Sequence, residues 1–572
     1  MTIVFPVLRR CFLGTLAALT VLSLAGCAAS SGDSLFTVTG EEELLPQVRA
    51  LFQIAGNALR PTPRTAPYVP VEHAGVNPFG MNVFLAQEVE PEKRERIVQL
   101  VSEAGFHWLR QGFPWEDIEI HGQGDFEDRR HDPVRSAWEK YDHIVDLAGE
   151  YDMDLIALLS NPPAWSRADG DARGTAAPPD DIEDFGGYVS AVVSRYRGRI
   201  RYYQIWNEPN IYPEWGEQPV DPEAYTELLC LAYDRVKAAD PNAVVISAAL
   251  AQTQQLDPRN MSDLVFLQRM YDAGAGDCFD ILAVNVYMLW SGPTDHRLRP
   301  FTFVDYARPL YLRDIMVTNG DAEKPIWFAE MNSNAVPNEP GIEGIGSYGQ
   351  VTLEQQARYA PLAYQRAMED WPWVGVVNFW FFKRPGVAEQ NQAWYYFRMM
   401  EPDFTPMPVY DAMREYIAEL EPTLYRGLHQ EDHWALSYEG AWDDVENPAA
   451  VLGRYRRAEP GATVSFAFEG HRLVLTPGAG SGQIDVSIDG HEPRTLALDG
   501  EPVELFSGLT VGRHQVEITA RSGGVGVDAP AVREPSWGPW ILVGLAALSI
   551  PLAAAYALRR QQVAGGSGGR RG

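Results

Sequence analysis

A glutamate directly after an apolar stretch is the first feature of this sequence that could do chemistry. Trp206-Asn207-Glu208-Pro209 follows residues 200–205, whose bulky residues alternate as in a buried strand. Because proline ends regular strand pairing, Glu208 is expected at the rim of a sheet and not in its core. A carboxyl, an amide and an indole side by side suit the binding of a sugar. A solvated loop glutamate is the alternative, since most glutamates are exposed.

Eight short apolar stretches alternate with amphipathic helical patterns and would position this glutamate. The predicted strands are 80–85, 107–111, 155–160, 202–206, 244–249, 281–287, 325–329 and 374–379. The predicted helices include 92–104, 138–150, 185–196, 224–239 and 409–420. This alternation favours a closed parallel (β/α)8 barrel. An open doubly wound sheet is the alternative, although no glycine-rich phosphate loop follows any strand.

A second glutamate, Glu330, ends the seventh of these strands, as Glu208 ends the fourth. The carboxyl ends of all strands in a parallel barrel meet on one face, where barrel active sites lie. We therefore expect the two carboxyls to share a site. Two such groups can cleave a glycosidic bond: one protonates the leaving oxygen and the other stabilises or captures the anomeric carbon.

The string Trp206-Asn207-Glu208-Pro209 resembles the acid/base motif of the retaining glycoside hydrolases of clan A, which are TIM barrels. The resemblance implies that Glu208 is the acid/base, that Asn207 contacts the sugar 2-hydroxyl and that Glu330 is the nucleophile. Residues 206–210 and 329–333 are most similar to family 39, with family 5 as a near alternative. Strand six departs from several clan families, because Asn285-Val286-Tyr287 contains no histidine.

The same resemblance implies substrate-binding residues at other strand ends. Arg110 matches an arginine that hydrogen-bonds the nucleophile, and Tyr287 matches a tyrosine that orients it. Trp380 matches the aromatic platform beneath the sugar. A structural role is the alternative for each of them. The remaining candidates for substrate contacts are Asn161, Trp165 and Asn332.

Composition limits the partners and cofactors of this 572-residue chain. A net charge of −30 argues against nucleic acid or another polyanion as a partner. No CxxC, HExxH or His/Cys cluster occurs, so we predict no metal site, and two carboxylates with water require no cofactor. Cys230 and Cys278 are the two cysteines of the chain body. We expect them to be buried and free, with a disulfide as the alternative.

The N-terminal residues predict export. Residues 1–27 place two arginines before an apolar run, which is the form of a signal peptide. Leu24-Ala25-Gly26-Cys27 resembles a bacterial lipobox, which would make Cys27 a lipidated N-terminus; an ordinary signal or an uncleaved anchor is the alternative. Residues 28–70 are expected to form a proline-rich spacer with a helix near 41–58, and residues 71–425 the barrel.

Residues 430–525 change to short alternating strands with Asp-Gly turns, which predicts an antiparallel β-sandwich. It resembles the jelly-roll modules attached to many carbohydrate-active enzymes, and sugar binding and mere packing are both open. The charge-free apolar stretch 538–558 predicts one transmembrane helix, with a buried soluble helix as the alternative. The arginines of residues 559–572 predict a cytoplasmic tail.

These features together predict a retaining glycoside hydrolase on the outer face of a bacterial cytoplasmic membrane. It would cleave a β-linked oligo- or polysaccharide through a covalent glycosyl-enzyme intermediate. The predicted fold is a TIM barrel followed by the β-sandwich and one transmembrane helix. Two alternatives are a catalytically idle glycan-binding surface protein and a transglycosylase that uses the same two carboxylates. The sequence indicates no protein partner.

Overall fold

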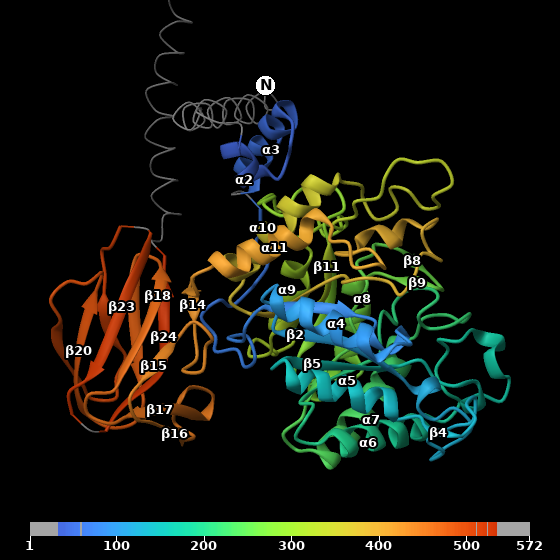
Figure 1. The fold of residues 1–572 in the computed structure, drawn as a ribbon. Helices are drawn as coiled ribbons and strands as arrows, with labels where there is room; N and C mark the ends of the chain where they lie inside the picture. The colour runs from blue at the N-terminus through green and yellow to red at the C-terminus, as the bar shows by residue number, and fades with distance from the viewer. Residues whose placement is uncertain (1–32, 58–59, 511, 523, 535–572) are drawn as a thin grey trace, which may run out of the picture.

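The computed structural model describes residues 33–57, 60–510, 512–522 and 524–534. An eight-stranded parallel sheet lies at the centre of its larger part (Figure 1). Its strands are β1 (Phe79–Val83), β2 (Trp108–Pro114), β5 (Asp154–Ser160), β6 (Tyr202–Ile205), β7 (Val244–Ile246), β10 (Leu282–Tyr287), β11 (Ile326–Asn332) and β12 (Val374–Phe379). β1 pairs with both β2 and β12. The parallel bridges Ile246–Ile281 and Leu250–Val284 join the remaining edges. The sheet is therefore a closed barrel, as predicted, and its strands follow the predicted order.

Eight helices of the described chain surround this barrel. They are α4 (Pro91–Glu103), α5 (Glu139–Glu150), α6 (Ile182–Tyr196), α7 (Pro222–Ala239), α8 (Asp263–Asp272), α9 (Pro309–Thr318), α10 (Leu353–Asp370) and α11 (Pro408–Glu419). α7 begins as its sequence indicates, because Asp221 accepts a hydrogen bond from the Ala224 amide and Pro222 fills the first turn. α8, α9 and α10 have no counterpart among the helices predicted above.

The barrel interior changes from aromatic to polar along its axis. Trp108, Tyr202 and Trp327 pack together near the amino ends of their strands, with ring centroids 5.0–5.1 Å apart. Inward-facing positions recur every second residue, so Arg110 and Gln204 lie one layer further along β2 and β6. Their side chains are buried and hydrogen-bonded to each other. The polar layer thus lies toward the carboxyl ends of the strands, where a barrel carries its active site.

A β-sandwich of two six-stranded sheets follows the barrel, in agreement with the predicted change of character. Its strands are β13 (Thr423–Leu424), β14 (Gly427–Leu428), β15 (Ser437–Glu439), β16 (Trp442–Glu446), β17 (Arg454–Ala458), β18 (Thr463–Glu469), β19 (Arg472–Pro477), β20 (Gly482–Ile488), β21 (Arg494–Leu498), β22 (Val503–Phe506), β23 (Arg513–Ala520) and β24 (Val525–Arg533). All pairs are antiparallel except β13 with β18. Alternate residues of these strands form a separate hydrophobic core.

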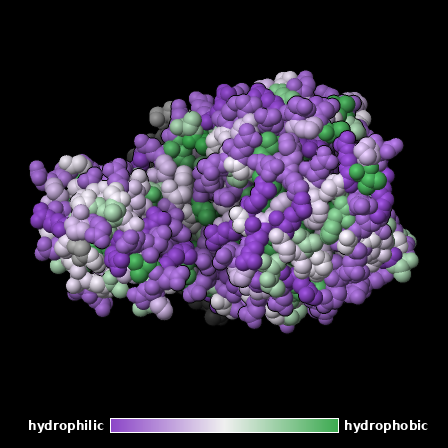
Figure 2. All heavy atoms as spheres, turned by 60° about the horizontal axis from the view of Figure 1, so that its bottom comes forward, coloured by the Kyte–Doolittle hydropathy of each residue, from purple (hydrophilic) through white to green (hydrophobic). Residues whose placement is uncertain are grey.

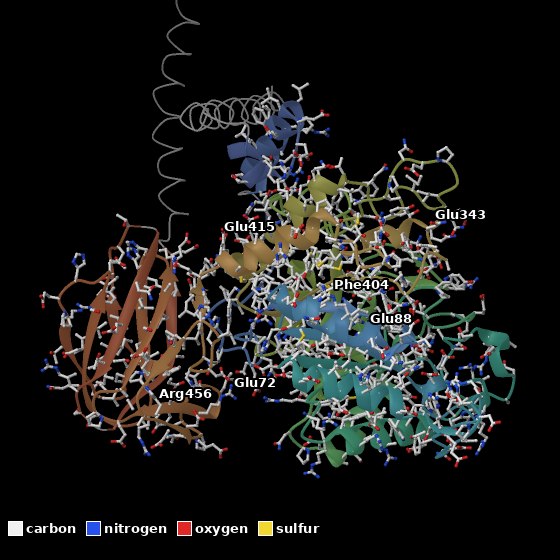
Figure 3. All side chains as sticks on the ribbon, viewed as in Figure 1. Glu72, Glu88, Glu343, Phe404, Glu415 and Arg456 are labelled. Atoms are coloured by element: carbon white, nitrogen blue, oxygen red, sulfur yellow. A yellow bond between two sulfur atoms is a disulfide. The ribbon has the colours of Figure 1, made fainter. Side chains whose placement is uncertain are left out.

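The sandwich contacts the end of the barrel that lies opposite the carboxyl ends of the strands. The Trp434 amide donates to the Gly75 carbonyl at 2.8 Å, and Arg454 pairs with Glu72 at 3.3 Å. Gly75 and Glu72 both precede β1. Figure 3 shows Glu72 between the barrel and the sandwich. On the face shown in Figure 2, hydrophilic residues predominate on both parts and the hydrophobic ones form small separate patches.

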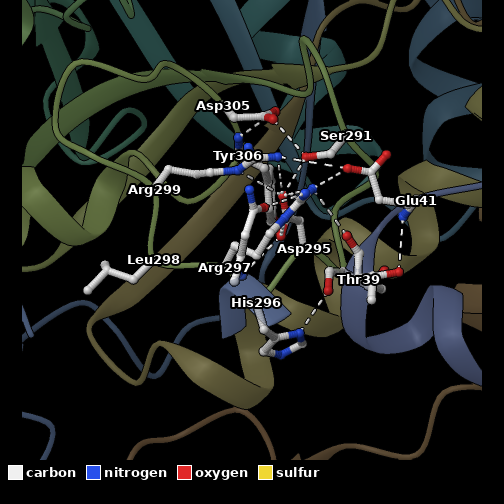
Figure 4. A network of polar contacts seen from close by, with 12 residues as sticks. Thr39, Glu41, Ser291, Asp295, His296, Arg297, Leu298, Arg299, Asp305 and Tyr306 are labelled. Carbon is white, nitrogen blue, oxygen red and sulfur yellow. Dashed lines mark hydrogen bonds and ion pairs between the residues drawn. The ribbon is translucent and has the colours of Figure 1, made fainter. Parts of the chain in front are cut away.

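Part of the predicted spacer is folded against the barrel. α2 (Asp33–Thr39) and α3 (Leu44–Asn57) form a helical pair, of which only α3 corresponds to the expected helix. Arg297 of the loop after β10 bonds to both Asp295 and Glu41, and the side chains of Arg297 and Asp295 are almost fully buried (Figure 4). A buried charge is stable only when it is paired. This cluster therefore fixes the helical pair to the loop.

The transmembrane helix in the predicted fold class is not borne out. No helix among the described residues combines the length and the apolar character needed to cross a membrane. α7 and α10 have 18 residues each, but charged side chains interrupt both, whereas a span needs about 20 mostly apolar residues. The segment 538–558 itself lies outside the described residues, as do the segments predicted to be a signal peptide and lipobox (1–27) and a cytoplasmic tail (559–572). We therefore remove the membrane span from the fold class.

The expectation of free cysteines is wrong. Cys230 of α7 and Cys278, just before β10, form a disulfide with their Cα atoms 4.7 Å apart. The barrel places the two residues side by side although 48 positions separate them. Sequence spacing could not decide this, because disulfide formation depends on Cα distance and direction.

Candidate active site

A β-bulge turns Glu330 into the barrel. Along β11, Val284 of β10 is opposite Phe328, but the next residue, Asn285, is opposite Glu330. Ala329 is therefore the extra residue, and a bulge of this kind reverses which face the following side chains occupy. Phe328 packs in the core between barrel and helices, whereas Glu330 points inward to Arg110.

Glu208 occupies a constrained turn directly after β6. Its φ is +45° and that of Trp206 is +71°, a region that residues with a side chain seldom adopt. The Glu208 amide donates to the Ala249 carbonyl at 2.9 Å, and the Trp206 indole donates to the Glu214 carbonyl at 2.9 Å. These bonds hold the turn, and such local strain is commonly found at functional sites.

Arg110 lies at the centre of the site and contacts two of the predicted residues, Glu330 and Asn207, and two further polar residues of the barrel. It donates at 3.2 Å to Glu330 and at 2.9 Å to Asn207. It also donates at 2.8 Å to Gln204 and at 2.7 Å to Asn82. Arg110 and Glu330 are 3% and 4% exposed, so this is a buried ion pair whose geometry matters strongly.

One strand, β10, holds both carboxyls. Tyr287 donates its hydroxyl to Glu330, and the Asn285 amide donates to Glu208 at 2.6 Å. These two residues are successive inward positions, about 6.6 Å apart along a strand. Glu208 and Glu330 therefore face each other across the space above β10. The site brings together Glu208, Glu330, Asn207, Arg110 and Tyr287 as predicted.

The surroundings of the two carboxyls separate their acidities. Burial raises the pKa of Glu208 well above its ordinary value, and the charges of Glu330 and Glu214 raise it further. Burial also raises the pKa of Glu330, but there Arg110 and the Tyr287 hydroxyl act in the opposite direction. One proton shared by the pair thus resides on Glu208, while Glu330 carries the negative charge.

A cavity of about 270 Å³ opens beside Glu330 and beside Asn207, the residue before Glu208. Glu330, Arg110, Asn207, Trp380 and Asn161 line it, in addition to Glu116 and the segment before it. Trp380 packs edge-on against Phe84 with ring centroids 5.7 Å apart, so its position is fixed. The cavity is concave, partly polar and next to the carboxyls, as a sugar-binding pocket would be. We call it the catalytic pocket.

Trp165 and Asn332 are not brought to the catalytic pocket. The Trp165 indole donates to the Glu119 carbonyl at 2.7 Å and packs against Trp115. Asn332 is fully buried, and its amide donates to the carbonyls of Trp380 and Phe397. Its amide nitrogen is thereby occupied, so the structure places Asn332 beneath the pocket as a support for the Trp380 backbone.

Four residues of the site had not been singled out as site residues. Asn82 and Gln204 support Arg110, and Asn285 binds Glu208. The signal for Asn285 was its position two residues before Tyr287, which puts both side chains on one face. Glu214 lies near both carboxyls, and burial and the charge of Glu330 raise its pKa to about 7. No strand pattern pointed to it, because it belongs to the loop after β6.

No group of three or more histidine, cysteine or carboxylate side chains in the described part of the chain is arranged to hold a metal ion. The polar groups of the site instead bond to one another. The arrangement can supply one protonated carboxyl, one ionised carboxyl and a rigid set of donors around them.

Solved structures similar to this chain include glycoside hydrolases of families 39 and 5. A family 39 glycoside hydrolase from Bacteroides cellulosilyticus is 17% identical, with 79% of this chain and 83% of that chain covered and a TM-score of 0.46. The family 39 enzyme from Xanthomonas axonopodis pv. citri is 14% identical and has a TM-score of 0.44. The match covers 82% of this chain and 99% of that chain. GH5_18 from Streptomyces cattleya in complex with GlcNAc is 17% identical and has a TM-score of 0.44. The match covers 63% of this chain and 84% of that chain.

Part of the β-sandwich matches a protein-family model. Residues 450–526 match the family model described as carbohydrate esterase 2 N-terminal. No curated protein sequence matches the chain.

Proposed function

We propose that the protein is a retaining glycoside hydrolase that cleaves a β-linked sugar chain. The observation that carries this proposal is the pair Glu208 and Glu330, each at the carboxyl end of a barrel strand and each held by one residue of β10. Environments that push the acidities of two carboxyls apart suit one to be an acid and the other to be a nucleophile.

In the first step, an ionised oxygen of Glu330 attacks the anomeric carbon while Glu208 gives its proton to the leaving oxygen. The glycosidic bond breaks and a bond from Glu330 to the sugar forms. Arg110 and Tyr287 hold Glu330 in place for this attack. In the second step, Glu208 takes a proton from a water molecule, and that water displaces Glu330 from the sugar. Both carboxyls return to their starting states.

We further propose that the substrate lies outside the cell, as the signal-like N-terminus predicts. The Cys230–Cys278 disulfide is compatible with this location, because disulfides persist in oxidising compartments.

A set of aryl β-glycosides with the full chain tests the mechanism. Glu330→Gln should abolish turnover, because an amide cannot act as the nucleophile. Glu208→Ala should slow turnover by 100-fold or more, and added azide should restore it by attacking the intermediate in the space left by the acid/base. Mass spectrometry after reaction with a 2-fluoro glycoside should find the sugar on Glu330. A Glu330→Gln protein as active as the wild type would overturn the proposal.

A further inference from the structure

A second cavity, of about 560 Å³, adjoins the catalytic pocket. Ala86 lines both, and the short helices η1 (Leu85–Gln87) and η2 (Trp115–Asp117) carry lining residues of each. We call it the distal cavity. The two cavities meet at Ala86 and at the neighbouring residues Glu116 and Asp117, and the volume of the distal cavity is sufficient for a sugar unit. Glu88 of its lining lies beside α4 (Figure 3).

The distal cavity contains a buried cation that forms no direct ion pair within the described chain, although the charges of Glu88 and Glu139 act on it from further away. Arg94, in the first turns of α4, is 8% exposed and lines the cavity. Its guanidinium donates to the backbone carbonyls of Glu88 at 2.9 Å and Val89 at 3.5 Å, and it forms no ion pair with any described residue. Burying a charge in this way is costly unless an opposite charge compensates it.

Two further lining groups have polar atoms without a partner. The Arg135 side chain, on β4 (Arg135–Ser136), makes no hydrogen bond or ion pair to the parts of the chain that the structure describes. The buried Nδ1 atom of His143, on α5, also has no partner there. Uncommitted groups of this kind, converging on one cavity, suit an anionic ligand.

Most carboxylates of the lining are already paired. Asp117 binds Lys140, Tyr141 and Arg130, while Asp128 binds Arg130 at 2.8 Å. Glu88 binds Lys383, which lies outside the lining. Glu139 alone among the lining carboxylates has no such partner within the described chain. The cations that remain available therefore outnumber the carboxylates that remain available.

We propose that the distal cavity binds an anionic sugar unit of the same chain whose next unit occupies the catalytic pocket. Arg94 and Arg135 would pair with the carboxylate or sulfate of that unit. The proposal rests on the proposed function, because it takes the unit in the catalytic pocket to belong to the sugar chain that is cleaved. The net charge of −30 disfavours polyanions at long range, but ions screen that repulsion beyond about 8 Å at physiological ionic strength. Direct pairing at the two arginines acts within this distance.

Binding measurements with the full-chain Glu330→Gln protein test the proposal without requiring turnover. The probes are three β-1,4-glucan tetramers that differ only at C6, which carries a hydroxymethyl group, a carboxylate or a sulfate ester. The carboxylate or the sulfate tetramer should bind at least tenfold more tightly than the neutral one, and the better of the two identifies the anion. Higher salt should reduce this preference.

Variants locate the preference. Arg135→Gln, at an exposed position, should reduce binding of the preferred anionic tetramer by about tenfold, as expected for one charged hydrogen-bond pair. Arg94→Met should do the same if it folds. Arg96→Gln is the matched control, because Arg96 lies on the same helix but bonds to Gln99 outside the cavity. Equal binding of the three tetramers, no binding of any, or an unchanged preference in Arg135→Gln would overturn the proposal. Anion-selective binding by a wild-type protein that cleaves no glycoside would instead overturn only the proposed function.

Discussion

Glu208 and Glu330 illustrate how surroundings, and not residue type, assign chemical roles. Both are glutamates at strand ends, but only Glu330 contacts an arginine and a tyrosine hydroxyl. Glu208 receives a hydrogen bond from a neutral amide and is close to two other carboxyls. Activity should therefore rise with pH as Glu330 ionises and fall as Glu208 loses its proton.

The neighbouring carboxyl of Glu214 should set the alkaline end of this profile. Its negative charge disfavours ionisation of Glu208, so Glu214→Gln should lower the pKa of Glu208 and move the alkaline limb of kcat to lower pH by up to one unit. Plots of kcat against pH for the wild type and the variant measure the shift.

Glu217→Gln is the control for this prediction, because Glu217 belongs to the same loop but is exposed and paired with Arg259. An alkaline limb that stays in place or moves upward in Glu214→Gln would contradict the interpretation.

At the scale of elements, the bulge in β11 decides whether the site exists. In a regular strand Glu330 would be opposite Val286 and would point outward with Phe328. Because Ala329 is an extra residue, Glu330 points into the barrel. Asn285 and Tyr287 of β10 then donate hydrogen bonds to the two carboxyls. Bulges are frequent next to active sites for this reason.

The disulfide between α7 and the segment before β10 should stabilise the barrel without affecting catalysis. Replacing Cys230 and Cys278 by alanine should lower the free energy of unfolding by about 2–4 kcal/mol, because the cross-link closes a loop of 48 residues in the unfolded chain. Since Cys278 precedes β10, far from its carboxyl end, kcat should change less than twofold.

Denaturant unfolding measures this loss. As a control, a reductant should lower the melting temperature of the wild type but not that of the double variant. A double variant as stable as the oxidised wild type would show that the cross-link contributes nothing.

At the scale of the whole molecule, the sandwich and the active site lie at opposite ends of the barrel. The sandwich contacts residues that precede β1. Glu208, in contrast, follows β6, and Glu330 lies near the carboxyl end of β11. The sandwich therefore does not extend the catalytic pocket. A small cavity of about 40 Å³ lies at the barrel–sandwich interface, and the buried His429 and the half-buried His433 line it.

These histidines should make the interface sensitive to acid. Burial lowers the pKa of His429 to about 4, and a hydrogen bond to the Tyr425 carbonyl opposes this only in part. The unfolded chain, with a histidine pKa near 6.5, binds more protons between these values, so the free energy of unfolding falls as pH drops from 6.5 to 4. The contribution of His429 is about 3 kcal/mol.

Denaturant unfolding between pH 7 and pH 4.5 checks this expectation. His429→Gln should reduce the dependence on pH, whereas a change at the exposed His121 should not. Burial raises the pKa values of Asp305 and Asp528 to about 6, so their contributions have the opposite sign, but they are common to both proteins. The difference therefore reports His429 together with its effect on the pKa of His433. Equal slopes for the wild type and His429→Gln would contradict the interpretation.

The sequence by itself determined the barrel and most of its site. Apolar stretches of strand length show where strands form, and parallel strands in a barrel share one direction, so residues at their carboxyl ends must meet. This is why Glu208 and Glu330 could be placed together, whereas Arg110 and Tyr287 were added by the resemblance to clan A. The order of strands and the sandwich also followed from local pattern.

Only the tertiary structure decided the contacts between positions far apart in the chain. The bulge at Ala329, the bond from Asn285 to Glu208 and the Cys230–Cys278 disulfide depend on which segments face each other. The position of Asn332 after Glu330 predicted a substrate contact. In the structure its amide instead donates to the carbonyls of Trp380 and Phe397, which orient the side chain. Local pattern fixes where a residue stands along a strand, whereas register and packing fix what its side chain touches.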